Sequence, residues 1–112
     1  MKVAVIGSRT ANGVDVKFIL GYIPPECSEI ISGGAQGIDS LAENAAAALS
    51  LPFTCIKPNY ERFGKLAPLQ RNIEIIEACD FVLAFWDMQS PGTKFVISEC
   101  LKREKPLKII RI

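Results

Sequence analysis

The stretch Ile31-Ser32-Gly33-Gly34-Ala35-Gln36-Gly37-Ile38-Asp39 decides the fold of this chain. Its first two residues end the short apolar run over 29–32, which is typical of a buried strand. After the glycines, apolar side chains recur at helical spacing from Ile38 to Leu49. A strand that passes through a glycine-rich turn into a helix predicts one unit of a parallel α/β sheet.

The rest of the chain repeats this alternation on both sides of the stretch. Apolar, β-branched runs predict strands over 2–7, 52–57, 80–86 and 107–112. Helical spacing predicts helices over 14–20 and 94–103, and a third that contains Leu69, Ile73 and Ile76 after a loop over 58–66. Strands joined by helical crossovers predict an α/β, doubly wound, three-layer sandwich formed by one domain over 1–112.

Composition and charge narrow the possible partners. The 112 residues carry 13 Lys and Arg against 12 Asp and Glu, a net charge of +1, which argues against nucleic acid as a partner. No apolar stretch approaches the about 20 residues of a membrane span, so we expect no membrane partner. The chain opens directly on a predicted strand, without an apolar leader, so we expect a cytoplasmic location.

Histidine and cysteine usage excludes several kinds of site. The chain has no histidine, which excludes Ser-His-Asp and Cys-His catalysis and zinc sites built on imidazole. Its four cysteines include no CxxC pair, so we expect free thiols and no metal or cofactor.

Three loops follow the predicted strands and converge at one edge of the predicted sheet. They cover residues 7–10, 32–39 and 86–93. In an open parallel sheet, ligands bind outside the carboxyl ends of the strands. Glycines allow close backbone approach, and the N–H groups at the start of a helix attract anions. The sequence therefore predicts a phosphate site, with Arg9 and Arg71 as the best cationic candidates.

Five motifs, IGSR, ISGGAQGIDSLAENAA, GKLAPLQRN, CDFVLAFWD and SPGT, occur in this order. Together they resemble the Smf/DprA–LOG Rossmann-like superfamily, and most closely its small YspA-like members. The resemblance implies a five-stranded parallel sheet in the order 3-2-1-4-5 and a nucleotide or nucleotide-derived ligand. Including Trp86, which we expect against the base, the candidate ligand-binding residues are Gly7, Ser8, Arg9, Ser32, Gly33, Gly34, Gly37, Asp39, Arg71, Asn72, Trp86, Ser90, Gly92 and Thr93.

Two alternatives from other functional classes stay open. A LOG-like hydrolase would cleave an N-glycosidic or phosphate bond with Asp39, Asp87 or Glu99 as acid or base, although Val96 stands where LOG enzymes carry a glutamate. A DprA-like protein would bind single-stranded DNA, although Gln36 and Glu43 replace the arginine and histidine that are usual in DprA.

Several candidates also have a purely structural interpretation. Ser32 would end a strand, and Asn72 would satisfy loop carbonyls. Asp39 and Thr93 would each cap a helix, a role that we favour for Asp39. The basic residues Lys102, Arg103, Lys105, Lys108 and Arg111 form either a nucleic-acid surface or a solvated face. The small side chains over 45–48 favour close packing on the sheet, or a homodimer or higher homo-oligomer.

Overall fold

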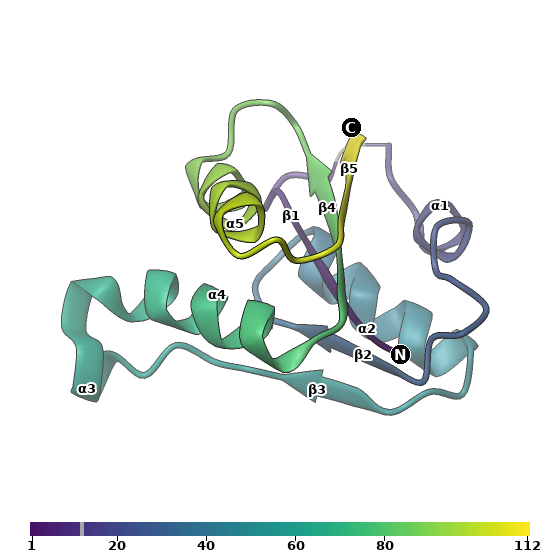
Figure 1. Ribbon diagram of the computed structural model, residues 1–112. Helices are drawn as coiled ribbons and strands as arrows, with labels where there is room; N and C mark the ends of the chain where they lie inside the picture. Colours follow the sequence, from purple (N-terminus) through teal and green to yellow (C-terminus); the bar gives the residue numbers. More distant parts are fainter. Residues whose placement is uncertain (12) are drawn as a thin grey trace.

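A computed structural model describes residues 1–11 and 13–112, and its centre is a sheet of parallel strands. The order β3-β2-β1-β4-β5 confirms the expected topology. The strands are β1 (Lys2–Gly7), β2 (Glu29–Ser32), β3 (Phe53–Cys55), β4 (Phe81–Trp86) and β5 (Leu107–Arg111). Every neighbouring pair is parallel, so each connection between strands crosses over the sheet, mostly through a helix (Figure 1).

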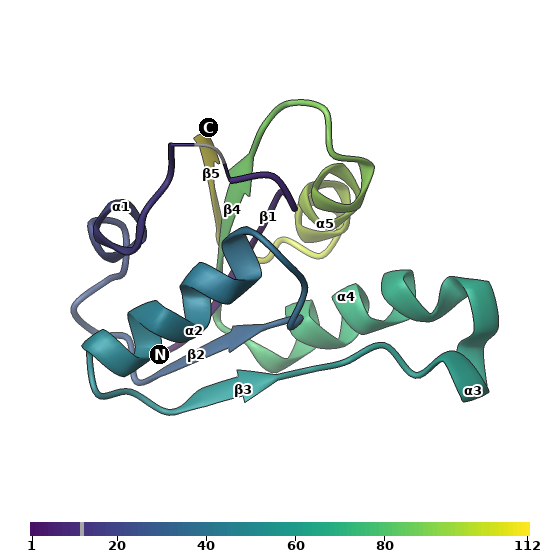
Figure 2. The same ribbon diagram turned by 180° about the vertical axis from the view of Figure 1, so that it is seen from behind.

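Helices cover both faces of the sheet (Figures 1 and 2). On one face lie α1 (Val16–Leu20) and α2 (Ile38–Ala48), and on the other lie α4 (Ala67–Ala78) and α5 (Pro91–Lys102). The short α3 (Tyr60–Phe63) and the 3-10 helix η1 (Gly64–Leu66) precede α4, away from the sheet. The longest described helices have 12 residues, too few to cross a bilayer.

The alternation of side chains along β1 divides the core in two. Val3 and Val5 pack with α1 and α2, whereas Ala4 and Ile6 pack with α4 and α5. All four side chains are buried, as expected for a strand in the middle of a covered parallel sheet. Burial of each large apolar side chain contributes about 1.5–3 kcal/mol. The two helical layers are thereby fixed on the two faces of β1.

The structure corrects two predicted boundaries. The segment expected to be a loop over 58–66 contains α3, which begins where the Asn59 side chain accepts a hydrogen bond from Arg62 N at 3.1 Å. Helix α5 begins at Pro91, three residues before the expected start at Lys94. Proline fits the first position of a helix because it lacks the N–H that would have no acceptor there.

Strand order reverses between β1 and β4. From β1 the chain leads to α1 on one face, and from the adjacent β4 it leads to α5 on the other face. The two loops therefore diverge at the carboxyl ends of these strands, the position at which α/β sheets bind ligands. The strands approach each other closely here, because a Cβ atom on Gly7 would lie 2.4 Å from the carbonyl oxygen of Phe85.

Candidate functional site

A cavity of about 400 Å³ opens at this switch point, between the loop after β1 and the helices α4 and α5. Its size is in the range of small-molecule sites. It brings together nine of the predicted ligand-binding residues, which are Gly7, Ser8, Arg9, Asp39, Arg71, Asn72, Ser90, Gly92 and Thr93. The rest of the lining comprises Thr10, Ala35 and Pro91, which lie in the three predicted loops, and Ile6, Pro68, Leu69, Ile75 and Val96, which sequence reasoning missed.

The amino-terminal end of α5 opens onto the cavity with unused backbone donors. The first intrahelical hydrogen bond runs from Lys94 N to the carbonyl of Ser90, and no side chain caps the helix. The N–H groups of Gly92 and Thr93 therefore have no acceptor within the helix. Thr93 is only 5% exposed. These groups form a cluster of donors at the positive end of the helix dipole.

Asp87 holds the turn that leads into α5. Its carboxylate accepts hydrogen bonds from Gln89 N at 2.9 Å, from Ser90 N at 2.7 Å and from Ser90 Oγ at 3.0 Å. These donors stabilise the charged form and lower the pKa of Asp87 to about 2. The Asp87 N–H also donates to Ser8 Oγ at 3.1 Å, which ties this turn to the loop after β1. Asp87, a candidate acid or base, thus lies outside the lining and positions the loop.

Arg71 connects α4 to the glycine-rich loop. Its Nη1 donates to the carbonyl of Gly33 at 2.7 Å, and its Nε donates to Asn72 Oδ1 at 2.9 Å. The Asn72 oxygen thus accepts from Arg71, so this amide orients the guanidinium. A guanidinium carries five N–H donors, so further donors remain for a ligand in the cavity.

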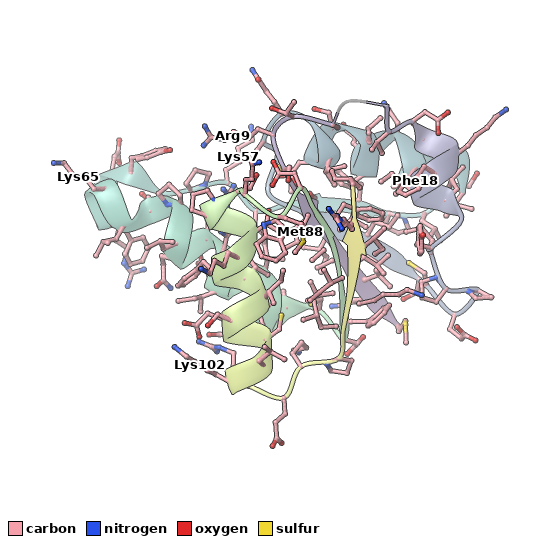
Figure 3. The ribbon with its side chains drawn as sticks, turned by 90° about the horizontal axis from the view of Figure 1, so that it is seen from above. Arg9, Phe18, Lys57, Lys65, Met88 and Lys102 are labelled. Atoms are coloured by element: carbon pink, nitrogen blue, oxygen red, sulfur yellow. The ribbon has the colours of Figure 1, made fainter. Side chains whose placement is uncertain are left out.

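Arg9 supplies a second cation at the same cavity, and its side chain is exposed. Figure 3 shows Arg9 near Lys57 in this view and far from Lys102, which lies at the carboxyl end of α5. The cavity therefore has an exposed arginine at its rim and a partly buried one, Arg71, in its wall.

Asp39 is the one carboxylate in the lining of the described part of the chain. Its side chain is 7% exposed, and Oδ2 accepts a hydrogen bond from Ala35 N at 3.1 Å. Burial raises the pKa of Asp39, while the Ala35 N–H, the Ser32 hydroxyl, the charge of Arg71 and the Gly33 N–H act in the opposite direction. The carboxylate thus holds the loop before α2, rather than capping the N–H groups of the helix itself.

The glycine-rich loop contributes less to the cavity than the sequence predicts. Gly33, Gly34 and Gly37 lie outside the lining. A Cβ atom on Gly33 would lie 2.6 Å from Arg71 Nη1, and one on Gly37, at φ +74°, would lie 2.3 Å from the carbonyl oxygen of Arg9. These glycines therefore allow close contact between segments of the protein itself.

Helix α2 is also partly occupied at its amino-terminal end. Ile38 N donates to the carbonyl of Ser8 at 3.3 Å, so this first N–H already has an acceptor. Ser32, also outside the lining, donates to the carbonyl of Val5 at 2.7 Å and joins β2 to β1. The free helix terminus at the cavity therefore belongs to α5.

Two aromatic side chains that could stack on a base, Trp86 and Tyr60, lie outside the lining. Trp86 Nε1 donates to the carbonyl of Ser90 at 3.1 Å, and its ring packs against the core under α4 and α5. Tyr60 lies on α3 and is 60% exposed. Trp86 therefore supports the turn before α5, where we expected it to contact a base.

The hydrolase alternative needs a second carboxylate near Asp39. Glu99 does not supply it, because it lies outside the lining and pairs with Arg103 at 3.6 Å and with Lys102 at 3.8 Å. Asp87 is engaged in the turn described above. In the described residues the cavity therefore holds no carboxylate pair for acid–base cleavage.

Four of the five basic residues near the carboxyl end have partners within the protein, and among them Lys102 pairs with Glu99. Arg103 also pairs with Glu77 at 3.3 Å, Lys105 donates to the carbonyl of Cys79 at 2.6 Å, and Lys108 lies over the Tyr22 ring. We therefore regard these side chains as a structural and solvated face rather than as a nucleic-acid surface.

Comparison with known proteins places this geometry in a context. No family model and no curated protein sequence matches the chain. Among solved structures it resembles the DNA processing protein A (DprA) of Helicobacter pylori, with a TM-score of 0.77 and 22% identity over 97% of this chain. It also resembles DprA of Streptococcus pneumoniae, with a TM-score of 0.79 and 21% identity over 96% of this chain. The chain has the fold of these DprA proteins.

The chain spans 64% of the H. pylori protein and 49% of the S. pneumoniae protein. The likeness concerns the fold, and the strand order is the one that the sequence resemblance implies. The H. pylori structure describes a mode of single-stranded DNA binding. The expectation that nucleic acid is an unlikely partner, which we based on net charge, is therefore wrong. A net charge of +1 does not prevent this fold from presenting a local site for phosphates.

Proposed function

We propose that the cavity binds the phosphate of a nucleotide at the amino-terminal end of α5. The supporting observation is that the unused N–H groups of Gly92 and Thr93 share one cavity with the guanidinium of Arg71. A helix terminus contributes about 0.3–1 kcal/mol and a hydrogen bond to a charged group about 1.5–3 kcal/mol. Micromolar affinity requires about 8 kcal/mol, so several of these contacts act together.

The remainder of the cavity suits the apolar part of such a ligand. Ile6, Ile75 and Val96 form a buried apolar wall, and Pro68 and Leu69 lie on the α4 side. A sugar and base would pack against these side chains while the phosphate lies on the donors of α5. The function of a nucleotide-binding module fits the small YspA-like members that the sequence resembles.

Calorimetry tests this function directly. Adenosine monophosphate is titrated into the protein, with adenosine as the matched ligand that lacks the phosphate. We expect the monophosphate to bind at least about tenfold more tightly, because the charge-assisted hydrogen bonds are lost without the phosphate. Arg9→Ala should weaken the binding of the monophosphate, whereas Lys102→Ala, a cation at the other end of α5, should not. Equal affinity for the two ligands would contradict the proposal.

Binding of single-stranded DNA is the second candidate, and the likeness to two DprA structures favours it. A nucleotide within a strand would place its phosphodiester at the same donors. Fluorescence anisotropy with a labelled single-stranded oligonucleotide and the matching duplex tests this function. We expect preference for the single strand and a shallow dependence on salt, since few phosphates are contacted. No binding at low salt would exclude this second candidate.

A further inference from the structure

Strand β5 forms one edge of the sheet, since it pairs only with β4 among the strands of the described residues (Figure 1). At the carboxyl end of this pairing, Ile112 N donates to the carbonyl of Trp86 at 3.0 Å. Backbone groups alternate in direction along a strand, so residues 108, 110 and 112 direct theirs toward β4. The N–H and carbonyl groups of Leu107, Ile109 and Arg111 therefore point away from β4, toward the open edge.

The same edge exposes apolar surface. Ile109 is 46% exposed at the middle of β5 and lies on the α5 face of the sheet, as does Leu107. Lys108 lies on the opposite face, over the Tyr22 ring. Natural proteins often shorten an edge strand or place proline in it, which prevents pairing with other chains. The other edge strand, β3, has only three residues, whereas β5 has five residues and no proline. Strand β5 is therefore the edge at which a further strand can pair.

We propose that two copies of this chain associate through β5, with the two strands antiparallel about a twofold axis. Ile109 then lies opposite the partner's Ile109, and each donates its N–H to the carbonyl of the other. Leu107 and the partner's Arg111 form the equivalent pair on either side of the axis. This register uses all the outward backbone groups of β5, and the two exposed Ile109 side chains cover each other on the α5 face.

Charge and strand length favour this register over its neighbours. Lys108 lies opposite the partner's Ile110, and Arg111 lies opposite the partner's Leu107, so each basic side chain faces an aliphatic one. A shift by two residues in one direction would place Lys108 directly opposite the partner's Lys108, a destabilising pair of like charges. The same shift in the other direction would leave Leu107 beyond the partner's β5. The strand is thus complementary to itself, as a twofold contact requires.

The association is independent of the proposed nucleotide site. The cavity lies at the carboxyl end of β1, and antiparallel pairing would place the two cavities at opposite ends of the joined sheet. Both copies therefore keep an open cavity, and the test requires no ligand. A contact along one strand is smaller than a standard interface of about 1,200–2,000 Å², so we expect a weak, reversible dimer.

Sedimentation velocity on the unmodified chain tests the association. We expect monomer at about 20 µM and an increasing fraction of dimer up to about 1 mM. The dimer should also strengthen as salt is raised from about 0.05 M to about 0.5 M, because basic side chains of two β5 strands come together and salt screens their repulsion. A chain that remains monomeric at about 1 mM, or a dimer that dissociates on added salt, would overturn the inference.

Two substitutions at Ile109 assign the dimer to β5. Ile109→Pro removes the N–H that would donate to the partner, while the pairing with β4 uses the N–H groups of the even-numbered residues. Ile109→Lys keeps the backbone and places like charges beside the twofold axis. We expect each variant to weaken the dimer at least about tenfold. Leu66→Lys is the matched control and should have no effect, because this 65% exposed side chain lies on η1, away from the sheet. A dimer of unchanged strength in folded Ile109→Lys would overturn the inference.

Amide hydrogen exchange locates the contact in the unmodified chain. The N–H of Ile109 should exchange more slowly at about 1 mM than at about 20 µM, because it becomes hydrogen-bonded in the dimer. Dimerisation without this protection would place the contact on another face, such as the small side chains of α2, and would overturn the role of β5.

Discussion

Arg71 lies directly across Gly33, with Nη1 2.7 Å from the glycine carbonyl and 2.6 Å from the place where a Cβ atom would stand. This contact sets the guanidinium in the cavity wall and explains why residue 33 has no side chain. The arginine and the glycine, which are 38 residues apart, therefore act as one unit.

Gly33→Ala should weaken ligand binding while changing the stability of the fold only slightly. The new methyl group meets the flexible end of Arg71, which moves aside at small cost, so the free energy of unfolding should change by less than about 1 kcal/mol. The displaced guanidinium should weaken binding of a nucleotide monophosphate. Urea denaturation and calorimetry measure the two effects, and unchanged affinity in a folded variant would show that Arg71 does not contact the ligand.

Gly37→Ala should instead destabilise the protein. Here a Cβ atom would lie 2.3 Å from the carbonyl oxygen of Arg9, and the backbone has φ +74°, where side chains are strained. Neither the backbone of Arg9 nor that of Ser8 can move without disturbing the loop after β1. We expect a loss of about 1–3 kcal/mol in the free energy of unfolding. Stability equal to that of the unmodified protein in urea denaturation would contradict this close packing.

The pKa of Asp39 predicts a dependence of stability on pH. Because burial raises this pKa above 3.8 in the folded protein, the folded state binds the proton more tightly than the unfolded chain. The contribution of Asp39 to stability should therefore fall as the pH rises from 3.8 through the raised pKa, and then level off. Asp39→Asn should remove this contribution.

The difference in unfolding free energy between Asp39→Asn and the unmodified protein should thus shift in favour of the variant as the pH rises. Urea denaturation from about pH 4 to about pH 8 measures this difference. A difference that is independent of pH would show that the carboxylate has the same pKa in the folded and unfolded states.

Asp87 predicts a contribution to stability that changes with pH in the opposite direction to that of Asp39. Three donors lower its pKa to about 2, so its contribution to stability is complete above pH 3.8 and is lost as the pH falls toward 2. Asp87→Ala should lower the urea midpoint near neutral pH and weaken nucleotide binding, because the turn before α5 loses its acceptor. The difference in midpoint from the unmodified protein should shrink below pH 3.8. A constant difference over this range would contradict the role of the charged carboxylate.

The sequence predicts the centre of the sheet well, because β1 and β4 are nearly continuous apolar runs. It misses α3, whose four residues are too few to show a helical period and whose start depends on the side chain of Asn59. Ile75 and Val96 were missed in the cavity, although they lie four residues after Arg71 and Gly92 and thus on the same helix faces.

The helix terminus that is free at the cavity is harder to predict. Glycines lie just before α2, at Gly33, Gly34 and Gly37, and in the first turn of α5, at Gly92, so the sequence predicts a free helix terminus at both. The choice between them depends on the hydrogen bond from Ile38 N to Ser8 O, which joins residues 30 positions apart. Local patterns in the sequence carry no information on such a contact.

The most direct test of the central claim is a titration followed through the backbone amide resonances. Adenosine monophosphate is added to protein labelled with nitrogen-15, and each N–H signal is followed by nuclear magnetic resonance. We predict the largest shifts at Gly92 and Thr93, whose N–H groups would donate hydrogen bonds to the phosphate, and small shifts at Gly34 and Gly37. Shifts confined to the glycine-rich loop, or no shifts at Gly92 and Thr93, would contradict the claim that α5 binds the phosphate.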